Sequence, residues 1–214
     1  MIRIHHLLDS QSERIIWLME ELELPYDLVC YPRDPATSMA PAAIRDLHPL
    51  GQAPVIEDDE TVLAESLAIT LYILEKFANG RLQVGRDTAA RADYLYWLCY
   101  SVGSLMPQAM LHMAAARIGE DNSPRGLVMR ERRQRHFDMI NARLSANDWL
   151  AGDTFSAADI MCHFPFGTMS KFAPLDITSY PAIGAWVSRI SERPGYQRAI
   201  RAAGHEHDPA QLPR

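Results

Sequence analysis

The first 77 residues alternate between strand-like and helix-like patterns of apolar positions. Residues 2–7 read as a short strand, and in residues 12–22 apolar side chains recur at helical spacing, at Ile15, Leu18, Met19 and Leu22. Pro25 ends that pattern, and residues 26–31 again read as a strand. The order strand, helix, strand is therefore predicted for this part of the chain.

The next segment predicts a short helix, two strands and a buried helix. The helix covers about residues 41–47, the strands cover 54–57 and 61–63 with a turn at 58–59, and the last helix covers 65–77. That last helix is apolar on most sides, which indicates burial between layers. Together these elements predict a four-stranded mixed sheet flanked by helices.

The remainder of the chain reads as helical. Residues 79–87 are polar and punctuated by glycine, so they are interpreted as a linker between a domain of residues 1–78 and an all-helical domain of residues 88–214. One long helix is predicted from 89 to about 118, kinked near Pro107, and an arginine-rich helix follows it. At Phe155 to Ile160, Ser156 and Asp159 have the spacing of a helix capping box, which favours a structural role for Asp159.

Composition and charge narrow the class of protein. The 214 residues are 48% hydrophobic and 22% charged, and the formal net charge of −6 argues against nucleic acid or an anionic membrane as partner. No apolar run approaches the length of about 18–20 residues that spans a bilayer, and the N-terminus has no signal-peptide pattern. Three separated cysteines imply no disulfide framework, so a cytoplasmic protein is expected. No metal site is expected either, because His5-His6, Cys162-His163 and the tail histidines His205 and His207 lack further ligands at suitable spacing.

The most informative chemistry lies between His48 and Ser66. Pro54 has no N–H and must sit at a strand start or edge, and its position after Gly51 favours a cis Ala53–Pro54 peptide. Such a bend would expose the backbone of Ala53 to a bound peptide. Ser66 at the following helix start would direct a hydroxyl and backbone N–H groups at a carboxylate, while Glu65 would take an ammonium. The segment predicts a site for a small zwitterionic peptide.

Three segments together resemble the cytosolic glutathione transferases. They are residues 6–22, with a serine-bearing first turn and first helix, the Pro54 segment up to Glu65-Ser66, and the capping box at Phe155 to Ile160. The resemblance implies an α/β thioredoxin-like N-terminal domain followed by an all-α helical-bundle domain. It also implies an enzyme that uses glutathione as co-substrate, without a metal, and that forms a homodimer.

The resemblance also implies roles for individual residues. Ser10 aligns with the serine that stabilises the glutathione thiolate in serine-type members, and Ser12 is the reserve candidate. A capping role for Ser10, paired with Glu13, remains open, and Gln11 and Glu13 depart from a commoner pattern with more positive charge. For glutathione itself, the resemblance implies that the backbone of Ala53 pairs with the cysteinyl unit and that Glu65 and Ser66 hold the γ-glutamyl end. Gln52 is expected near the glycyl carboxylate, with His48 as another candidate donor to it. Pro54 and Val55 are expected to form the wall of the site.

The expected reaction is conjugation of glutathione to a small hydrophobic electrophile, as in detoxification. The electrophile is expected between the domains, against an apolar wall that includes Tyr96, Tyr100, Met106, Met110 and Met113; the alternative for these residues is an ordinary helical core. Two other functions remain open, which are a glutathione-dependent peroxidase or isomerase and a non-catalytic binding module of the same fold. A disulfide reductase is disfavoured because no cysteine lies near residue 10.

Overall fold

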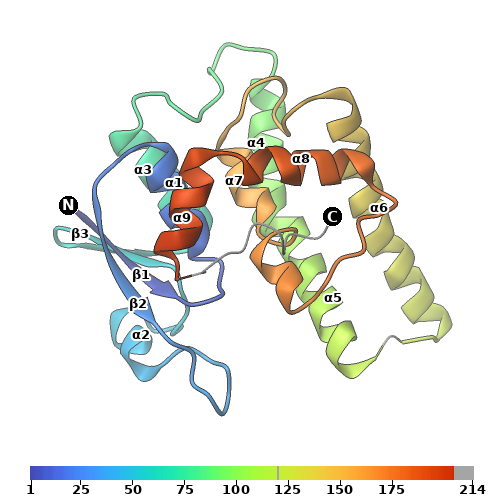
Figure 1. Cartoon of the computed structure of the whole chain (residues 1–214), viewed down its shortest axis with the longest axis horizontal. Coiled ribbons are helices and arrows are strands. Elements are labelled where there is room, and N and C mark those ends of the chain that lie inside the picture. Colours follow the sequence, from blue (N-terminus) through green and yellow to red (C-terminus); the bar gives the residue numbers. More distant parts are fainter. Residues whose placement is uncertain (120, 205–214) are drawn as a thin grey trace. The chain divides into compact units, whose positions relative to one another are not determined.

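The computed structural model describes residues 1–119 and 121–204 and divides into two compact units (Figure 1). Of the described residues, the first unit comprises 1–82 and 191–204, and the second comprises 83–119 and 121–190. His205 and His207 lie outside the described residues. The chain thus changes units within the predicted linker of residues 79–87 but returns to the first unit near its C-terminal end.

The first unit is built on a mixed sheet of four strands in the order β2-β1-β3-β4. The strands are β1 (Ile2–Leu7), β2 (Tyr26–Tyr31), β3 (Val55–Asp58) and β4 (Thr61–Ala64). β1 is parallel to β2 and antiparallel to β3, and β3 is antiparallel to β4. The central strands β1 and β3 have the most buried residues, because each is paired with a strand on both sides. The predicted mixed sheet is confirmed.

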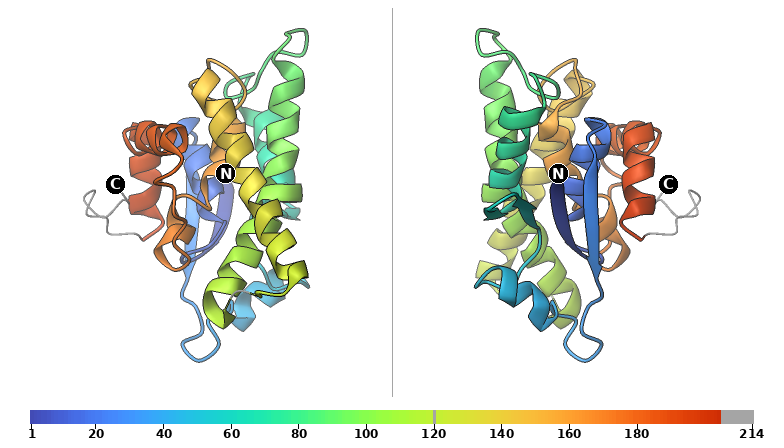
Figure 2. Two further views of the ribbon diagram at one scale, coloured as in Figure 1. Left: turned by 90° about the vertical axis from the view of Figure 1, so that its right-hand side faces the viewer. Right: turned by 90° about the vertical axis from the view of Figure 1, so that its left-hand side faces the viewer.

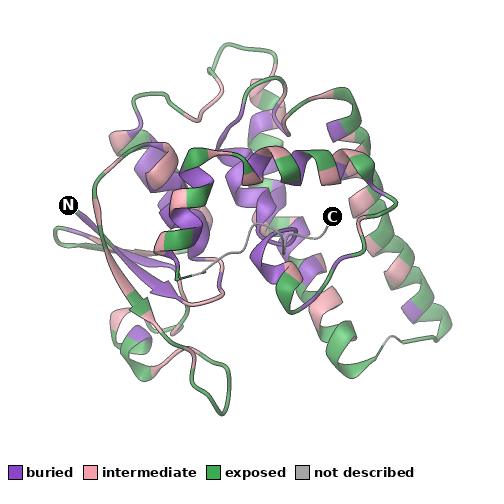
Figure 3. Ribbon diagram, viewed as in Figure 1, coloured by how far each residue is buried: buried purple, intermediate pink, exposed green. Residues whose placement is uncertain are grey.

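Four helices belong to this unit: α1 (Glu13–Glu21), α2 (Ala42–Leu47), α3 (Ser66–Phe77) and α9 (Pro194–Ala202). α1 is buried along most of its length (Figure 3). α9 packs beside α1 (Figures 1 and 2) through a two-pronged ion pair, in which Nε and Nη2 of Arg193 lie 2.8 and 2.7 Å from the carboxylate of Glu21. The last described helix therefore belongs with the sheet, although the sequence placed everything after residue 88 in one helical domain.

The helix α3 is less buried than its composition suggested. Ile69, Thr70, Ile73 and Leu74 are buried on one face, whereas Leu71 retains 39% of its surface exposed. The prediction that α3 is buried on most sides is thus wrong for a single chain, because only one face of α3 contacts the rest of its unit.

The second unit is helical. Its elements are α4 (Arg91–Tyr100), the π-helical segment η1 (Ser101–Leu105), α5 (Met106–Ile118), α6 (Pro124–Ala146), α7 (Ala157–His163), the 3₁₀ turn η2 (Thr168–Lys171) and α8 (Pro181–Ser191). The predicted long helix is interrupted as expected near Pro107, but the irregularity is a π-helical turn that precedes the proline. The N–H of Met106 bonds the carbonyl of Ser101, five residues back, which accommodates a proline ring that would collide with the carbonyl four residues before it.

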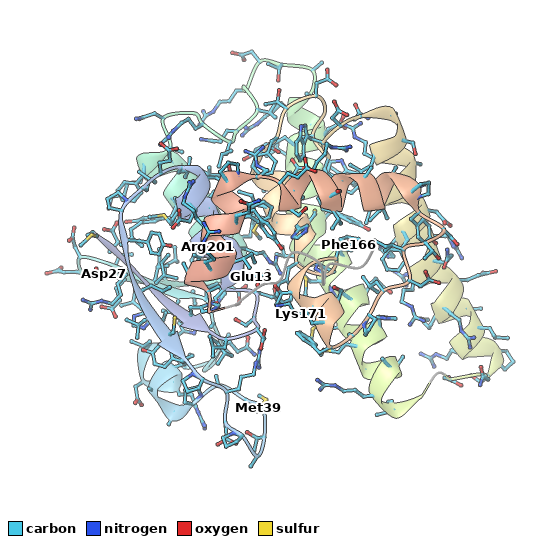
Figure 4. All side chains as sticks on the ribbon, viewed as in Figure 1. Glu13, Asp27, Met39, Phe166, Lys171 and Arg201 are labelled. Carbon is cyan, nitrogen blue, oxygen red and sulfur yellow. The ribbon has the colours of Figure 1, made fainter. Side chains whose placement is uncertain are left out.

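The capping box at α7 is present as predicted. Asp159 is fully buried and accepts hydrogen bonds from the backbone of Ser156 and Leu150 and from the indole of Trp186. Phe166 lies beside the same indole, with ring centroids 5.8 Å apart, and is labelled in Figure 4. Asp159 therefore joins the start of α7 to α8. No helix within residues 1–119 and 121–204 combines the length and the apolar character that crossing a membrane requires.

Candidate functional site

The turn between β1 and α1 places two serines in a buried hydrogen-bond cluster. Ser12 has no exposed surface, and its hydroxyl lies 2.8 Å from Nδ1 of His6 and 2.7 Å from the hydroxyl of Ser10. Ser10 accepts a further bond from the backbone N–H of Ser12 and keeps 8% of its surface exposed. Of the two serines, Ser10 is therefore the one that keeps accessible surface.

The hydrogen bonds of Ser10 and Ser12 bear on whether either serine caps α1. Ser12 occupies the N-cap position of α1 but makes no side-chain cap bond, because its hydroxyl is committed to His6 and Ser10. Ser10 caps the N–H of Ser12, and the N–H of Glu13 bonds the backbone carbonyl of Ser10. The hydroxyl of Ser10 thus accepts the N–H of Ser12, whereas the suggested capping box would direct the N–H of Glu13 to that hydroxyl.

Two arginines hold this turn in place. Arg33 donates from Nε to the carbonyl of Leu8 at 2.9 Å and from Nη2 to the carbonyl of Asp9 at 2.8 Å. Asp9 itself has a positive φ of 53°, a conformation that a non-glycine residue needs such support to keep. Arg14, which is 1% exposed, donates from Nη2 to the side-chain oxygen of Gln11 and so orients that amide.

A small polar pocket of about 100 Å³ lies beside this turn. It is lined from the first turn by Gln11, from the turn before β3, and from the junction of β4 and α3; the lining residues are Gln11, His48, Leu50, Gln52, Ala53, Pro54, Ala64, Glu65 and Ser66. The predicted cis peptide between Ala53 and Pro54 is present. Gly51 has φ +60°, and a Cβ there would lie 2.4 Å from the side chain of Arg45, so glycine fits this turn best.

The pocket is closed on one side by the N-terminus of α3. Glu65 at the N-cap has φ 74° and ψ 113°, an unfavourable backbone conformation for a non-glycine residue, and makes no side-chain cap bond. Ser66 is the first helical residue and is 7% exposed. The first N–H groups of a helix have no partner within the helix and favour an anion together with the helix dipole. The arrangement thus offers a carboxylate site next to the acidic side chain of Glu65.

Six of the seven residues expected to contact glutathione, His48 included, line this pocket. Val55 is fully buried in β3 instead, where it pairs with Ala64 and His5, so it supports the wall from behind. Ser10 is adjacent in sequence to the lining residue Gln11. The sequence singled out neither Gln11 nor Leu50 as a contact, although the position of Gln11 beside Ser10 was an available signal.

The residues expected around the electrophile do not gather in one place. Tyr96 and Tyr100 stack with ring centroids 5.6 Å apart and line a hollow of about 500 Å³ between α4 and α6. Met106 is only 5% exposed and packs in a core cluster with Phe164 and Met169, so its long apolar side chain serves the core, whereas Met110 is 44% exposed. Met106 therefore fits the alternative that the sequence left open for these residues, an ordinary helical core.

The described part of the chain contains no group of three or more His, Cys, Asp or Glu side chains arranged to hold a metal ion. The adjacent residues His5 and His6 do not form a pair of metal ligands. The two histidines of β1 point to opposite faces of the sheet, and His5 contacts Glu57 and Tyr31 while His6 contacts Ser12.

Comparison with known proteins points to one family over nearly the whole chain. Residues 10–76 match the family model described as glutathione S-transferase, N-terminal domain, and residues 105–194 match glutathione S-transferase, C-terminal domain. Glutathione S-transferase 1 of Saccharomyces cerevisiae is 30% identical over 92% of both chains. The disulfide-bond oxidoreductase YfcG of Escherichia coli is 29% identical over 95% of this chain and 96% of its own.

The solved structures agree with the sequence relatives. A crystal structure of a glutathione S-transferase from Actinobacillus pleuropneumoniae superposes with a TM-score of 0.87 at 29% identity, covering 100% of this chain and 98% of the other. Similarity of this extent covers both units and the turn that carries Ser10.

Proposed function

Because this chain belongs to the glutathione S-transferase family, we propose that it adds the thiolate of glutathione to small hydrophobic electrophiles, with the Ser10 hydroxyl stabilising the thiolate. The observation that carries this proposal is the polar pocket at the N-terminus of α3, which lies next to the first turn of α1. Thiolate stabilisation is assigned to that first turn, and binding of the peptide to the pocket.

The pocket supports a definite orientation of glutathione. The γ-glutamyl group carries a carboxylate and an ammonium, which suit the N–H groups at Ser66 and the side chain of Glu65 respectively. The backbone of Ala53 is the partner proposed for the cysteinyl unit, and Gln52 is the partner proposed for the glycyl carboxylate. This orientation would leave the thiol to be directed toward Ser10.

The energy required for activation is within reach of the first turn. A thiol with a pKa of about 8.5 is only a few per cent ionised at neutral pH, and lowering that pKa by about two units needs about 2.7 kcal/mol. A hydrogen bond from a hydroxyl to a charged sulfur contributes about 1.5–3 kcal/mol, and the N-terminus of α1 adds about 0.3–1 kcal/mol. One hydroxyl at this position therefore suffices for most of the shift.

The electrophile is proposed to contact the helical unit, through the ring faces of Tyr96 and Tyr100. The exposure of Tyr96, which keeps 49% of its surface accessible, supports this, and the buried Tyr100, at 6%, lines the same hollow. Tyr96→Ala should then raise KM for the electrophile and leave KM for glutathione unchanged. We further propose that the protein forms a homodimer, which sedimentation velocity would test directly.

The central experiment compares the wild type with Ser10→Ala, and with Ser145→Ala on the exposed face of α6 as a matched control. Glutathione affinity is measured by calorimetry, thiolate by ultraviolet difference spectra against pH, and turnover with aryl halides, epoxides and activated alkenes. Ser10→Ala should raise the pKa of the bound thiol by about 1–2 units and lower kcat about 10–100-fold near neutral pH. Absence of glutathione binding, or equal turnover in wild type and Ser10→Ala, would remove Ser10 from this role.

A second candidate is glutathione-dependent disulfide reduction, which the similarity to the Escherichia coli oxidoreductase favours. The lack of a cysteine near Ser10 argues only against a route through a protein thiol, because two glutathione molecules can supply both electrons and leave as glutathione disulfide. Turnover of a small disulfide without conjugation of any electrophile would favour this reaction. Turnover of organic hydroperoxides alone would favour the peroxidase, and glutathione binding without any turnover would favour the binding module.

A further inference from the structure

A buried series of hydrogen bonds runs from the end of α9 through β1 to Ser10. Nε2 of His6 lies 3.1 Å from the carbonyl oxygen of Ala203, the C-cap residue of α9, and Nδ1 lies 2.8 Å from the hydroxyl of Ser12. The hydroxyls of Ser12 and Ser10 are 2.7 Å apart. His6 and Ser12 have no exposed surface, so the series reaches the surface at Ser10.

The direction of every proton in this series follows from its fixed end. A carbonyl oxygen only accepts, so Nε2 of His6 carries the hydrogen and donates it to Ala203. In the neutral ring Nδ1 is then an acceptor and takes the hydroxyl proton of Ser12 at 2.8 Å, a shorter contact than the 3.4 Å from the same hydroxyl to the carbonyl oxygen of Leu7. Ser12 has no second proton to give, so Ser10 must donate to it.

The resting orientation of Ser10 has a consequence for thiol binding. Its own proton points to Ser12, and its oxygen also accepts the N–H of Ser12 at 3.2 Å. The free lone pair of Ser10 is thus suited to accept the S–H proton of a neutral thiol. It is not yet oriented to donate to a thiolate.

We propose that His6 accepts the proton of the glutathione thiol through Ser12 and Ser10; this deepens the proposed function and depends on it. In the step, the S–H bond breaks and its proton binds Ser10 Oγ, the original Ser10 proton passes to Ser12 Oγ, and the original Ser12 proton passes to Nδ1 of His6. The S–H electron pair stays on sulfur. The products are a thiolate that accepts a hydrogen bond from Ser10 and an imidazolium that donates from both nitrogens, so proton and charge are conserved.

The surroundings of His6 suit it to this task. Its Nε2 meets the C-terminal end of α9, where the carbonyl groups and the helix dipole favour a cation. The N–H of Leu7 donates to Ser12 Oγ at 3.2 Å, which holds this hydroxyl between its two partners. Among the titratable side chains on the elements that pack against β1, Cys30 is the register partner of His6 on β2, and Glu13 begins α1 and is labelled in Figure 4. Tyr31 of β2 and Glu57 of β3 contact His5 instead, on the opposite face of the sheet. Burial raises the pKa of the Cys30 thiol, which keeps it uncharged.

The test counts protons and thiolates in the same binding event. Glutathione is titrated into the protein near pH 7, where its free thiol is mostly protonated, in buffers of different ionisation enthalpy, and the thiolate is read from its ultraviolet absorbance. The wild type should form thiolate while releasing almost no proton to the buffer. Ser12→Ala interrupts the series, so one of two results is expected. Either the fraction of bound glutathione that is thiolate falls about tenfold, which corresponds to a rise of about one unit in the pKa of its thiol, or each thiolate that forms releases one proton to the buffer.

Controls separate this role from simple packing. Ser101→Ala removes a hydroxyl that is equally buried but lies in the helical unit, and it should behave as the wild type. His6→Asn offers an acceptor to Ser12 that cannot be protonated, and it should also release a proton with each thiolate. Nitrogen-15 chemical shifts of His6 in the wild type, which need no variant to fold, should change from the Nε2–H tautomer to imidazolium on binding.

The outcomes distinguish the two proposals. Three results would each overturn the relay and leave the transferase proposal standing. They are the release of one proton per thiolate by the wild type, a neutral His6 in the complex, and unchanged thiolate and proton counts in a folded Ser12→Ala. Failure of the wild type to bind glutathione would refute the proposed function itself, and the relay with it.

Discussion

Replacing Asp159 by asparagine tests whether the most conspicuous buried acid of the helical unit serves folding or chemistry. Oδ1 of Asp159 accepts from the N–H of Leu150 and from the indole of Trp186, each at 3.0 Å. Oδ2 accepts from the N–H of Ser156 at 3.1 Å and from its hydroxyl at 3.3 Å. Asparagine has a single side-chain oxygen. Either the two donors that bond Oδ1 or the two donors that bond Oδ2 must therefore lose their acceptor and face an NH₂ group.

The magnitude follows from those contacts. A buried donor left without an acceptor costs about 1–3 kcal/mol, so Asp159→Asn should lower the free energy of unfolding by about 2–5 kcal/mol. Burial raises the pKa of Asp159 to about 6, so the side chain is a carboxylate at about pH 7.5 and all of its donors are satisfied there. Because the folded pKa lies above its ordinary value, the contribution of this residue to stability falls as pH rises from about 4 to 6.

Urea unfolding, followed by tryptophan fluorescence at about pH 7.5, measures the change, since Trp186 itself contacts the carboxylate. Asp153→Asn is the matched control, because Asp153 is exposed in the same segment and should change stability by less than about 0.5 kcal/mol. Turnover per folded molecule should be the same in all proteins. A loss of stability below about 1 kcal/mol, or a fall in kcat at unchanged stability, would refute the structural role.

Three further perturbations test the ion pairs and the pocket. The hydrogen bond from Lys76 holds the pKa of Asp58 below its usual value, so Asp58→Asn should destabilise the protein by about 1 kcal/mol at neutral pH, and the difference measured by urea unfolding should disappear as pH falls below about 4. Arg193→Met leaves the buried carboxylate of Glu21 without its charged partner and should lower the free energy of unfolding by about 2–3 kcal/mol. Amide hydrogen exchange should become faster in α9 alone, and unchanged exchange in α9 would contradict the argument. Gln52→Ala should weaken glutathione binding about 10–100-fold by calorimetry without changing stability, and equal affinity would exclude Gln52 as a carboxylate partner.

Much of the fold could be predicted from the sequence because it depends on local patterns. The strands at residues 2–7 and 26–31 were predicted with their observed bounds, since alternating or continuous apolar runs and a stopping proline act over a few residues. The Ser156–Asp159 capping box and the turn before Pro54 are likewise local, because their hydrogen bonds or backbone constraints involve residues within a few positions of each other.

The features that only the tertiary structure decided depend on contacts between residues far apart in the sequence. His6 and Ala203 are 197 positions apart, and Glu21 and Arg193 are 172 apart, so no periodicity could place α9 on the sheet or connect it to Ser10. The same holds for Met106, which helical spacing cannot assign to a core or to a pocket wall, because burial depends on what the rest of the chain brings against it. The sequence therefore determined which elements form, whereas long-range packing and desolvation determined which of the two serines keeps accessible surface and which residues lie behind it.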